Sequence, residues 1–194
     1  TDSNMQSAIA RISHSLTVLG HAGLRINLYD DDIVSKANLG RQLFHKGDVG
    51  QNKAAVLISR TNRFFDTQFK AYPFKYNKVN QKRLAKDGAA NIIITCVDTV
   101  KARFEIADML TEFAKQNSNN LYRPMYWLDL GNSKNTAQAI LSTIGEIKQP
   151  NSRKYLSVSQ LPFVTHKYGD LLQQSEEKDD TPSCSLAEAL NKQD

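Results

Sequence analysis

The sequence predicts an α/β protein in which a Rossmann-like, mostly parallel sheet is flanked by helices and extended by an antiparallel hairpin. Two strand patterns, with helical periodicity around them, support this fold class. Residues 24–29 (LRINLY) alternate apolar and polar side chains, which is typical of a strand with one buried face. Residues 91–98 (NIIITCVD) contain a continuous, β-branched apolar run, which favours a central parallel strand that is buried on both faces.

The first helix is predicted over about residues 4–19, where apolar side chains recur at three- and four-residue spacing ahead of Gly20. These side chains are Met5, Ile9, Ile12, Leu16 and Leu19. A nucleotide-binding α/β unit opens with an apolar strand and a glycine-rich turn before its first helix. We therefore expect that the first strand and its glycines are missing from this chain.

The later elements are predicted to alternate between helix and strand in the same way. They are a helix at 54–65, a short strand at 69–76, a helix at about 101–116, and two hairpin strands at 125–130 and 137–144. Residues 173–183 are polar and strongly acidic, so we expect a mobile crossing loop. A capping box formed by Ser185 and Glu188 predicts one more helix. The whole chain, 1–194, is expected to form one domain.

The composition argues against several classes of protein. No run of about 18 apolar residues and no charged-then-apolar leader occurs, so we expect no membrane span and no secretion signal, with a cytoplasmic setting as the default. Two cysteines without close spacing cannot build a disulfide framework or a four-cysteine zinc site. The formal net charge is +5, and basic residues gather between Lys70 and Lys86. A solvated face is the favoured interpretation of that cluster, with a patch for a polyanion or an acidic partner as the alternative.

Polar residues crowd the segment that follows the first predicted strand. Asp30 and two further aspartates lie at the carboxyl end of that strand, which is where ligands bind in open α/β sheets. An acidic residue in this position typically accepts hydrogen bonds from ribose hydroxyls. Asn38, Arg41 and Lys53 supply donors suited to phosphate oxygens. The combination predicts a site for a nucleoside triphosphate.

An aspartate and a cysteine farther along the chain are also candidates. Asp98 closes the apolar strand, where a carboxylate can hold a Mg²⁺ ion that bridges phosphates; capping of the next helix is the alternative role. Cys184 lies just ahead of the predicted helix at Ser185, which favours the thiolate, whereas four upstream carboxylates oppose it. Cys184 is thus either a nucleophile or a packing residue. Cys96, inside the apolar strand, is expected to be a small core residue.

Several segments resemble a known family. DDDIVSKANLGRQLF, DVGQNKA and ITCVDT resemble signature segments of the ThiF/MoeB/HesA superfamily, the relatives of the ubiquitin-activating enzymes. Through YWLDLGN and TPSCSLAEAL, the chain is most similar to the ThiF-family proteins of the PRTRC genetic system, a bacterial plasmid-associated gene cluster. The resemblance implies ATP- and Mg²⁺-dependent adenylation of the C-terminal glycine of a small ubiquitin-like protein by a homodimer. In some members, transfer to an enzyme cysteine follows.

The same resemblance implies a role for each candidate residue. The roles are ribose binding for Asp30, contacts with ATP phosphates for Asn38 and Arg41, the lysine after the D-x-G segment for Lys53, and contact with magnesium and the adenylate for Asp98. Cys184 falls where eukaryotic activating enzymes carry their thioester-forming cysteine, with Ser185 in place of the usual Thr. The paired-cysteine zinc site of many relatives is absent from this sequence.

Two other classes of function remain open from the sequence. A nucleotide-binding scaffold could recruit a partner without catalysis and use the same fold as a docking surface. A dinucleotide-dependent oxidoreductase is suggested by Asp30 alone. The oxidoreductase interpretation explains Arg41, Lys53 and Asp98 poorly.

Overall fold

The computed structural model describes residues 2–84, 88–116, 123–132, 137–145 and 147–178. The described residues form two compact units, one up to Tyr76 and the other from Asn77 onward. The described strands form one sheet in each unit.

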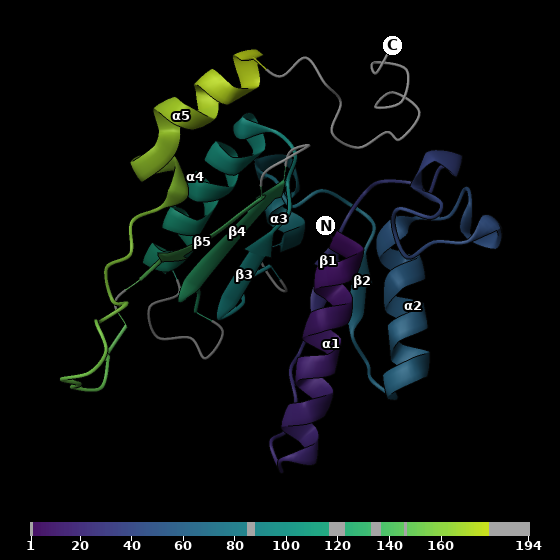
Figure 1. Cartoon of the computed structure of the whole chain (residues 1–194), viewed down its shortest axis with the longest axis horizontal. Coiled ribbons are helices and arrows are strands. Elements are labelled where there is room, and N and C mark those ends of the chain that lie inside the picture. The colour runs from purple at the N-terminus through teal and green to yellow at the C-terminus, as the bar shows by residue number, and fades with distance from the viewer. Residues whose placement is uncertain (1, 85–87, 117–122, 133–136, 146, 179–194) are drawn as a thin grey trace. The chain divides into compact units, whose positions relative to one another are not determined.

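The first unit is a parallel strand–helix–strand unit preceded by a helix (Figure 1). Its elements are α1 (Asp2–Val18), β1 (Asn27–Tyr29), η1 (Lys36–Asn38), η2 (Lys46–Asp48), α2 (Lys53–Phe65) and β2 (Lys70–Tyr72). β1 and β2 pair in parallel with Leu28 opposite Ala71, and α2 connects them. β2 ends directly before Pro73, because proline has no amide hydrogen to give to a ladder.

Two apolar clusters pack the first unit. The first consists of Ala10, Ile58 and Phe69. The second consists of Val34, Phe44, Val56 and Leu57. Because Val34 and Phe44 belong to the long connection between β1 and α2, the second cluster holds that connection against the helix.

The face that α1 buries differs from the face that its apolar periodicity predicts. The buried residues with described side chains are Ser3, Gln6, Ala10 and Ser13. Gln6 Nε2 donates a hydrogen bond of 2.6 Å to Thr61 Oγ1 on α2. In contrast, Ile12 is 54% exposed and Leu19, just after the helix, is 82% exposed. Small and hydrogen-bonded side chains let two helices pack closely, and an apolar repeat does not report this kind of contact.

The second unit contains a three-stranded mixed sheet with helices packed beside it (Figure 1). Its elements are η3 (Lys78–Asn80), α3 (Gln81–Leu84), β3 (Ile92–Thr95), α4 (Val100–Gln116), β4 (Tyr126–Asn132), β5 (Ala137–Thr143) and α5 (Val164–Lys178). β3 pairs with β4 in parallel, and β4 pairs with β5 in antiparallel orientation. The predicted hairpin is therefore confirmed, as is the helix that follows the apolar strand.

The prediction that the apolar strand is central and buried on both faces is wrong for the described sheet. The strand order is β3–β4–β5, so β4 is central and β3 lies at the edge. Ile92 is 57% exposed, and only Ile93 and Thr95 of this strand are buried. The fully buried Trp127 on β4 takes the central position because the hairpin adds β5 on the far side of that strand.

The acidic segment 173–183 was predicted to be a loop, and its first part is helical instead. α5 extends to Lys178, so residues 173–178 continue this helix. Glutamate, glutamine and lysine are good helix formers, and this propensity outweighs the absence of apolar side chains over a few residues. The remainder, residues 179–183, lies outside the described residues, as do Cys184 and the helix predicted at Ser185.

Acidic partners accompany two lysines of the basic cluster. Lys78 Nζ lies 2.9 Å from Asp108 Oδ2 on α4, and Lys75 Nζ lies 3.7 Å from Asp31 Oδ2. The hydrogen bond with the Asp108 carboxylate raises the pKa of Lys78 above its ordinary value. These pairs agree with the interpretation of this cluster as a solvated face. Within the described ranges, no helix combines the length and apolar character that crossing a bilayer requires.

The unexpected face of α1 gives a test of the packing. Ala10 is completely buried, so Ala10→Leu should lower the free energy of unfolding by about 1–3 kcal/mol through overpacking. Ile12→Ala, on the exposed side, should change it by no more than about 0.5 kcal/mol. Urea denaturation of both variants measures the two effects. A larger loss in Ile12→Ala than in Ala10→Leu would contradict the observed orientation of α1.

Candidate nucleotide-binding site

The loop after β1 presents three carboxylates at the carboxyl end of a parallel strand. Ligand oxygens of Asp30, Asp31 and Asp32 all lie within 4.8 Å of one another. Asp30 Oδ1 accepts a hydrogen bond of 2.8 Å from the amide of Asp32, and the amide of Asp30 donates to the carbonyl of Tyr72 on β2. Asp30 is half-buried, whereas Asp31 and Asp32 are exposed. Asp30 therefore shapes the turn that carries the other two.

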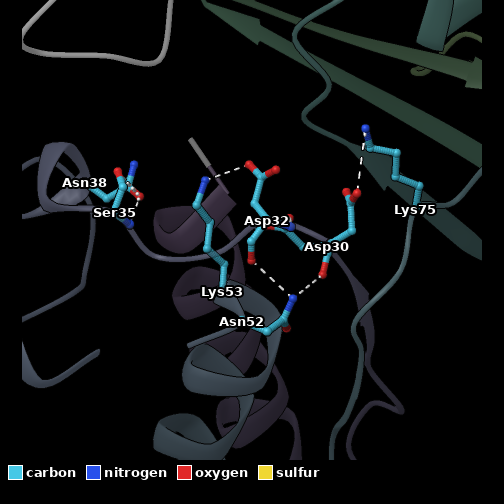
Figure 2. Close-up of polar contacts among 8 residues, drawn as sticks. Asp30, Asp32, Ser35, Asn38, Asn52, Lys53 and Lys75 are labelled. Atoms are coloured by element: carbon cyan, nitrogen blue, oxygen red, sulfur yellow. Dashed lines mark hydrogen bonds and ion pairs between the residues drawn. The ribbon is translucent and has the colours of Figure 1, made fainter. Parts of the chain in front are cut away.

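Asn52, which sequence reasoning missed, ties this loop to the start of α2. Its Nδ2 donates to the carbonyl oxygens of Asp30 at 2.8 Å and Asp32 at 3.2 Å (Figure 2). Its Oδ1 accepts from the amide of Ala55 at 2.9 Å and thereby caps the helix. An asparagine directly before a helix is a recognisable capping signal, but the bonds to a loop about 20 residues earlier are not visible in the sequence.

Lys53 is brought to the acidic loop by this arrangement. Its Nζ lies 2.7 Å from Asp32 Oδ2, and its side chain is only 13% exposed, whereas that of Asp32 is 61% exposed (Figure 2). The backbone amide of Lys53 also donates to the carbonyl of Asp32 at 2.9 Å. A lysine ammonium thus lies at the carboxyl end of β1, as a phosphate-binding role requires, and Asp32 is its partner.

Asn38 has a structural role in the turn that precedes Arg41. The Asn38 side chain is buried, and its Oδ1 accepts hydrogen bonds from the Ser35 amide at 2.9 Å and from Ser35 Oγ at 3.1 Å (Figure 2). Because the oxygen serves the turn, the group that Asn38 can offer to a ligand is its NH₂ donor. Gly40 follows with a φ of +78°, a conformation that suits glycine, and Arg41 comes next with an exposed side chain.

A buried carboxylate supports the next part of the connection, and sequence reasoning missed it too. Asp48 is 5% exposed; its Oδ2 accepts from the His45 amide at 2.8 Å and lies 2.7 Å from Arg60 Nη2. Burial by itself raises the pKa of Asp48, but the amide bond from His45 and the Arg60 guanidinium outweigh it and hold the pKa below the ordinary value. Asp48 thus joins the segment before Lys53 to α2.

Asp98 belongs to the second unit, where it is exposed in the loop between β3 and α4. Thr99 occupies the position directly before α4, and its Oγ1 accepts a hydrogen bond of 3.2 Å from the Ala102 amide, as a helix cap does. Cys96, at the start of this loop, is half-buried, so the prediction of a core position is met only in part.

The structure therefore gathers part of the predicted site. Asp30 and Lys53 lie on adjoining segments, held by Asn52, and Asn38 and Arg41 lie on a neighbouring turn of the same unit. A parallel strand–helix–strand unit with polar residues at the carboxyl end of its strands is the arrangement of Rossmann-like nucleotide-binding domains.

The family model for "ThiF family" matches residues 13–191, which is nearly the whole chain, and the chain belongs to this family. "Adenylyltransferase and sulfurtransferase UBA4" of Kluyveromyces lactis is 29% identical over 106 residues, which make up 52% of this chain and 23% of UBA4. The match to the family agrees with the resemblance read from the sequence.

Solved structures with the same fold include PaaA and Escherichia coli MccB. PaaA has a TM-score of 0.50 and 15% identity over 85% of this chain and 51% of PaaA. MccB has a TM-score of 0.50 and 20% identity over 91% of this chain and 47% of MccB. These likenesses support the α/β fold alone. The chain spans about a quarter of UBA4 and about half of the other two proteins.

The lowered pKa of Asp48 predicts a pH dependence of stability. The ion pair of Asp48 with Arg60 contributes its full stabilisation at pH values above the unfolded-state pKa, near 3.8. This stabilisation is lost as the pH falls through the lower pKa of the folded state. At pH 7, Asp48→Asn should lower the free energy of unfolding by about 1–3 kcal/mol, and the difference from wild type should shrink as pH falls from about 5 toward 2. Urea denaturation across this range measures it.

Asp66→Asn is the matched control for this measurement. Asp66 is an exposed aspartate at the C-cap of α2 with a φ of +52°, which asparagine tolerates well. The difference in the free energy of unfolding between Asp66→Asn and wild type should stay small and change little with pH. A difference for Asp48→Asn that stays constant down to pH 2 would contradict the assigned pKa.

Proposed function

We propose that this chain is an adenylation domain that uses ATP to activate the C-terminal glycine of a small ubiquitin-like protein. The observation that carries the proposal is the acidic strand end at Asp30, which Asn52 holds beside Lys53. Membership of the ThiF family supports it, and so does the similarity to UBA4, which is described as an adenylyltransferase.

In this proposal the residues of the first unit bind ATP. The carboxylate of Asp30 accepts hydrogen bonds from the ribose, while the donors of Asn38, Arg41 and Lys53 contact phosphate oxygens. The observed geometry supports such a division because Asp30 is held by the turn, whereas the guanidinium of Arg41 is exposed to solvent. Lys53 would exchange its contact with Asp32 for a phosphate oxygen when ATP binds.

Asp98 would hold the metal ion in the second unit. Its carboxylate is exposed at the carboxyl end of a parallel strand, and Mg²⁺ prefers hard oxygen ligands together with water and phosphate oxygens. The donor chemistry therefore fits Mg²⁺. Bound there, the ion would neutralise phosphate charge.

The chemical step requires two anions to approach each other. The terminal carboxylate of the partner protein attacks the α-phosphorus, a new O–P bond forms, and the bond to the β-phosphate breaks so that pyrophosphate leaves. Arg41 and Lys53 would offset the negative charge that opposes the attack and hold the reacting groups in line.

The narrower expectations belong to the same proposal. They are membership of the PRTRC subfamily, a homodimer and a thioester on Cys184. The Cys184 assignment rests on the sequence resemblance, since Cys184 lies outside the described residues.

A scaffold that binds nucleotide without catalysis is the second candidate. This candidate is favoured because site residues already contact other residues of the chain: Lys53 contacts Asp32, and Asn38 contacts Ser35. Binding of ATP by the intact protein without any partner-dependent pyrophosphate exchange would support the scaffold and overturn the proposed adenylation.

Exchange kinetics test the assigned residues. Arg41→Ala and Asp98→Ala should each lower partner-dependent exchange of pyrophosphate into ATP by about 10²- to 10³-fold, because each removes one contact that offsets phosphate charge. Arg11→Ala, which removes an exposed arginine from α1, should leave exchange unchanged. Circular dichroism should show all three variants folded. Near-normal exchange in either site variant would refute its role.

Covalent transfer has a separate test with a matched cysteine control. The intact protein, incubated with ATP, Mg²⁺ and a small protein ending in glycine, should form an adduct that a thiol reagent cleaves. The adduct should be lost in Cys184→Ala and retained in Cys96→Ala. Denaturing gel electrophoresis without reductant detects it. An unchanged adduct in Cys184→Ala would remove that cysteine from the proposed reaction.

A further inference from the structure

A buried ion pair lies beneath the loop that carries Asp98. Arg103 on α4 is 6% exposed and Asp129 on β4 is fully buried, and Arg103 Nε lies 3.0 Å from Asp129 Oδ2. Asp129 Oδ1 accepts a hydrogen bond of 2.7 Å from Thr95 Oγ1, and Oδ2 also accepts from Gln138 Nε2 at 3.1 Å. Both oxygens of the carboxylate therefore have hydrogen-bond partners.

A buried ion pair of this kind adds little net stability to a fold. Taking two charges out of water costs several kcal/mol per ion, and well-packed apolar side chains of similar volume often stabilise a core equally well. Arg103 makes a second hydrogen bond, which connects the ion pair to the β3–α4 loop. Arg103 Nη2 donates to the carbonyl oxygen of Val97 at 2.8 Å, and Val97 is the residue directly before Asp98.

The network fixes the β3–α4 loop at both of its ends. At the start, Thr95 is held by Asp129 and also accepts a hydrogen bond of 2.9 Å from Trp127 Nε1. One residue before Asp98, the Val97 carbonyl is held by Arg103. At the end, Thr99 caps α4. The backbone before Asp98 is thus held by the buried Arg103, and the residue after it caps α4, while Asp98 itself is exposed.

Gly131 on β4 supplies the room for this arrangement. A Cβ atom at this position would lie 3.0 Å from Arg103 Nη2 and 3.1 Å from side-chain atoms of Gln138. Glycine inside a strand weakens the strand and often marks a place where another group approaches closely. Here the approaching group is the guanidinium that reaches Val97.

We propose that Arg103 is a positioning residue that holds the β3–α4 loop so that Asp98 presents its carboxylate outward for the metal, and that Asp129 orients Arg103. This inference rests on the proposed function, because it gives Asp98 the role of a ligand. The buried carboxylate of Asp129 would then set the orientation of the exposed carboxylate of Asp98 through Arg103.

Arg103→Lys tests the proposal in the full-length protein, because it keeps the charge and removes the fork that reaches both Asp129 and Val97. Amide hydrogen exchange of residues 96–99 should become at least about tenfold faster, while residues 105–116 of α4 keep their protection. The Mg²⁺ concentration for half-maximal pyrophosphate exchange should rise by about 10- to 100-fold, with the KM for the partner protein unchanged.

Two further variants keep the test decisive. Gly131→Ala retains both charges but crowds the guanidinium, and it should change both readouts in the same direction by a smaller factor. Lys78→Gln removes a different ion pair of α4, the one with Asp108, and should change neither.

Each outcome then has one meaning. Unchanged protection of residues 96–99 in Arg103→Lys, or an equal loss of protection over the whole second unit, would overturn the positioning role. A normal Mg²⁺ dependence with a loosened loop would overturn it as well. If wild type performs no pyrophosphate exchange, the proposed function fails, and hydrogen exchange alone decides whether Arg103 holds the loop.

Discussion

The attachment of the acidic loop to the first turn of α2 is the constraint on which the candidate site depends. One side chain, that of Asn52, satisfies two loop carbonyls and caps the helix at the same time. Backbone groups that lose water must find such partners, so the loop and the helix start are fixed together. Asp30 and Lys53, which are 23 positions apart in the sequence, become neighbours for this reason.

In both units a side chain holds the loop at the carboxyl end of a parallel strand, but the side chain differs between them. In each, a loop follows a parallel strand, leads to a helix and exposes at least one carboxylate, and a side chain of the following helix or its cap reaches back to a loop carbonyl. Asn52 does this in the first unit and Arg103 in the second. Loop carbonyls at strand ends are otherwise left to water, and their capture explains how irregular backbone can be held still enough to bind a ligand.

The sequence predicted those parts of the fold that depend on local pattern. The α2 and α4 helices, the hairpin and the acidic strand end follow from periodicity and turn residues. It could not predict the buried face of α1, because contact through Ala10 and Gln6 leaves no apolar repeat. Nor could it predict the edge position of β3 or the Arg103–Asp129 pair, since strand order and contacts 26 residues apart are set by tertiary packing.

The contact between Lys53 and Asp32 has a consequence for ligand selectivity. The carboxylate of Asp32 contacts the Lys53 ammonium as a phosphate oxygen would, so an incoming anion has to displace this carboxylate. A pair with one exposed partner contributes about 0.2–1 kcal/mol, which amounts to no more than about a fivefold reduction in affinity. In the proposed site, a triphosphate with several other contacts would overcome this competition easily. A single inorganic anion, with only the lysine to bind, would gain far less from displacing Asp32, and the loop would thereby discriminate by the number of contacts a ligand can make.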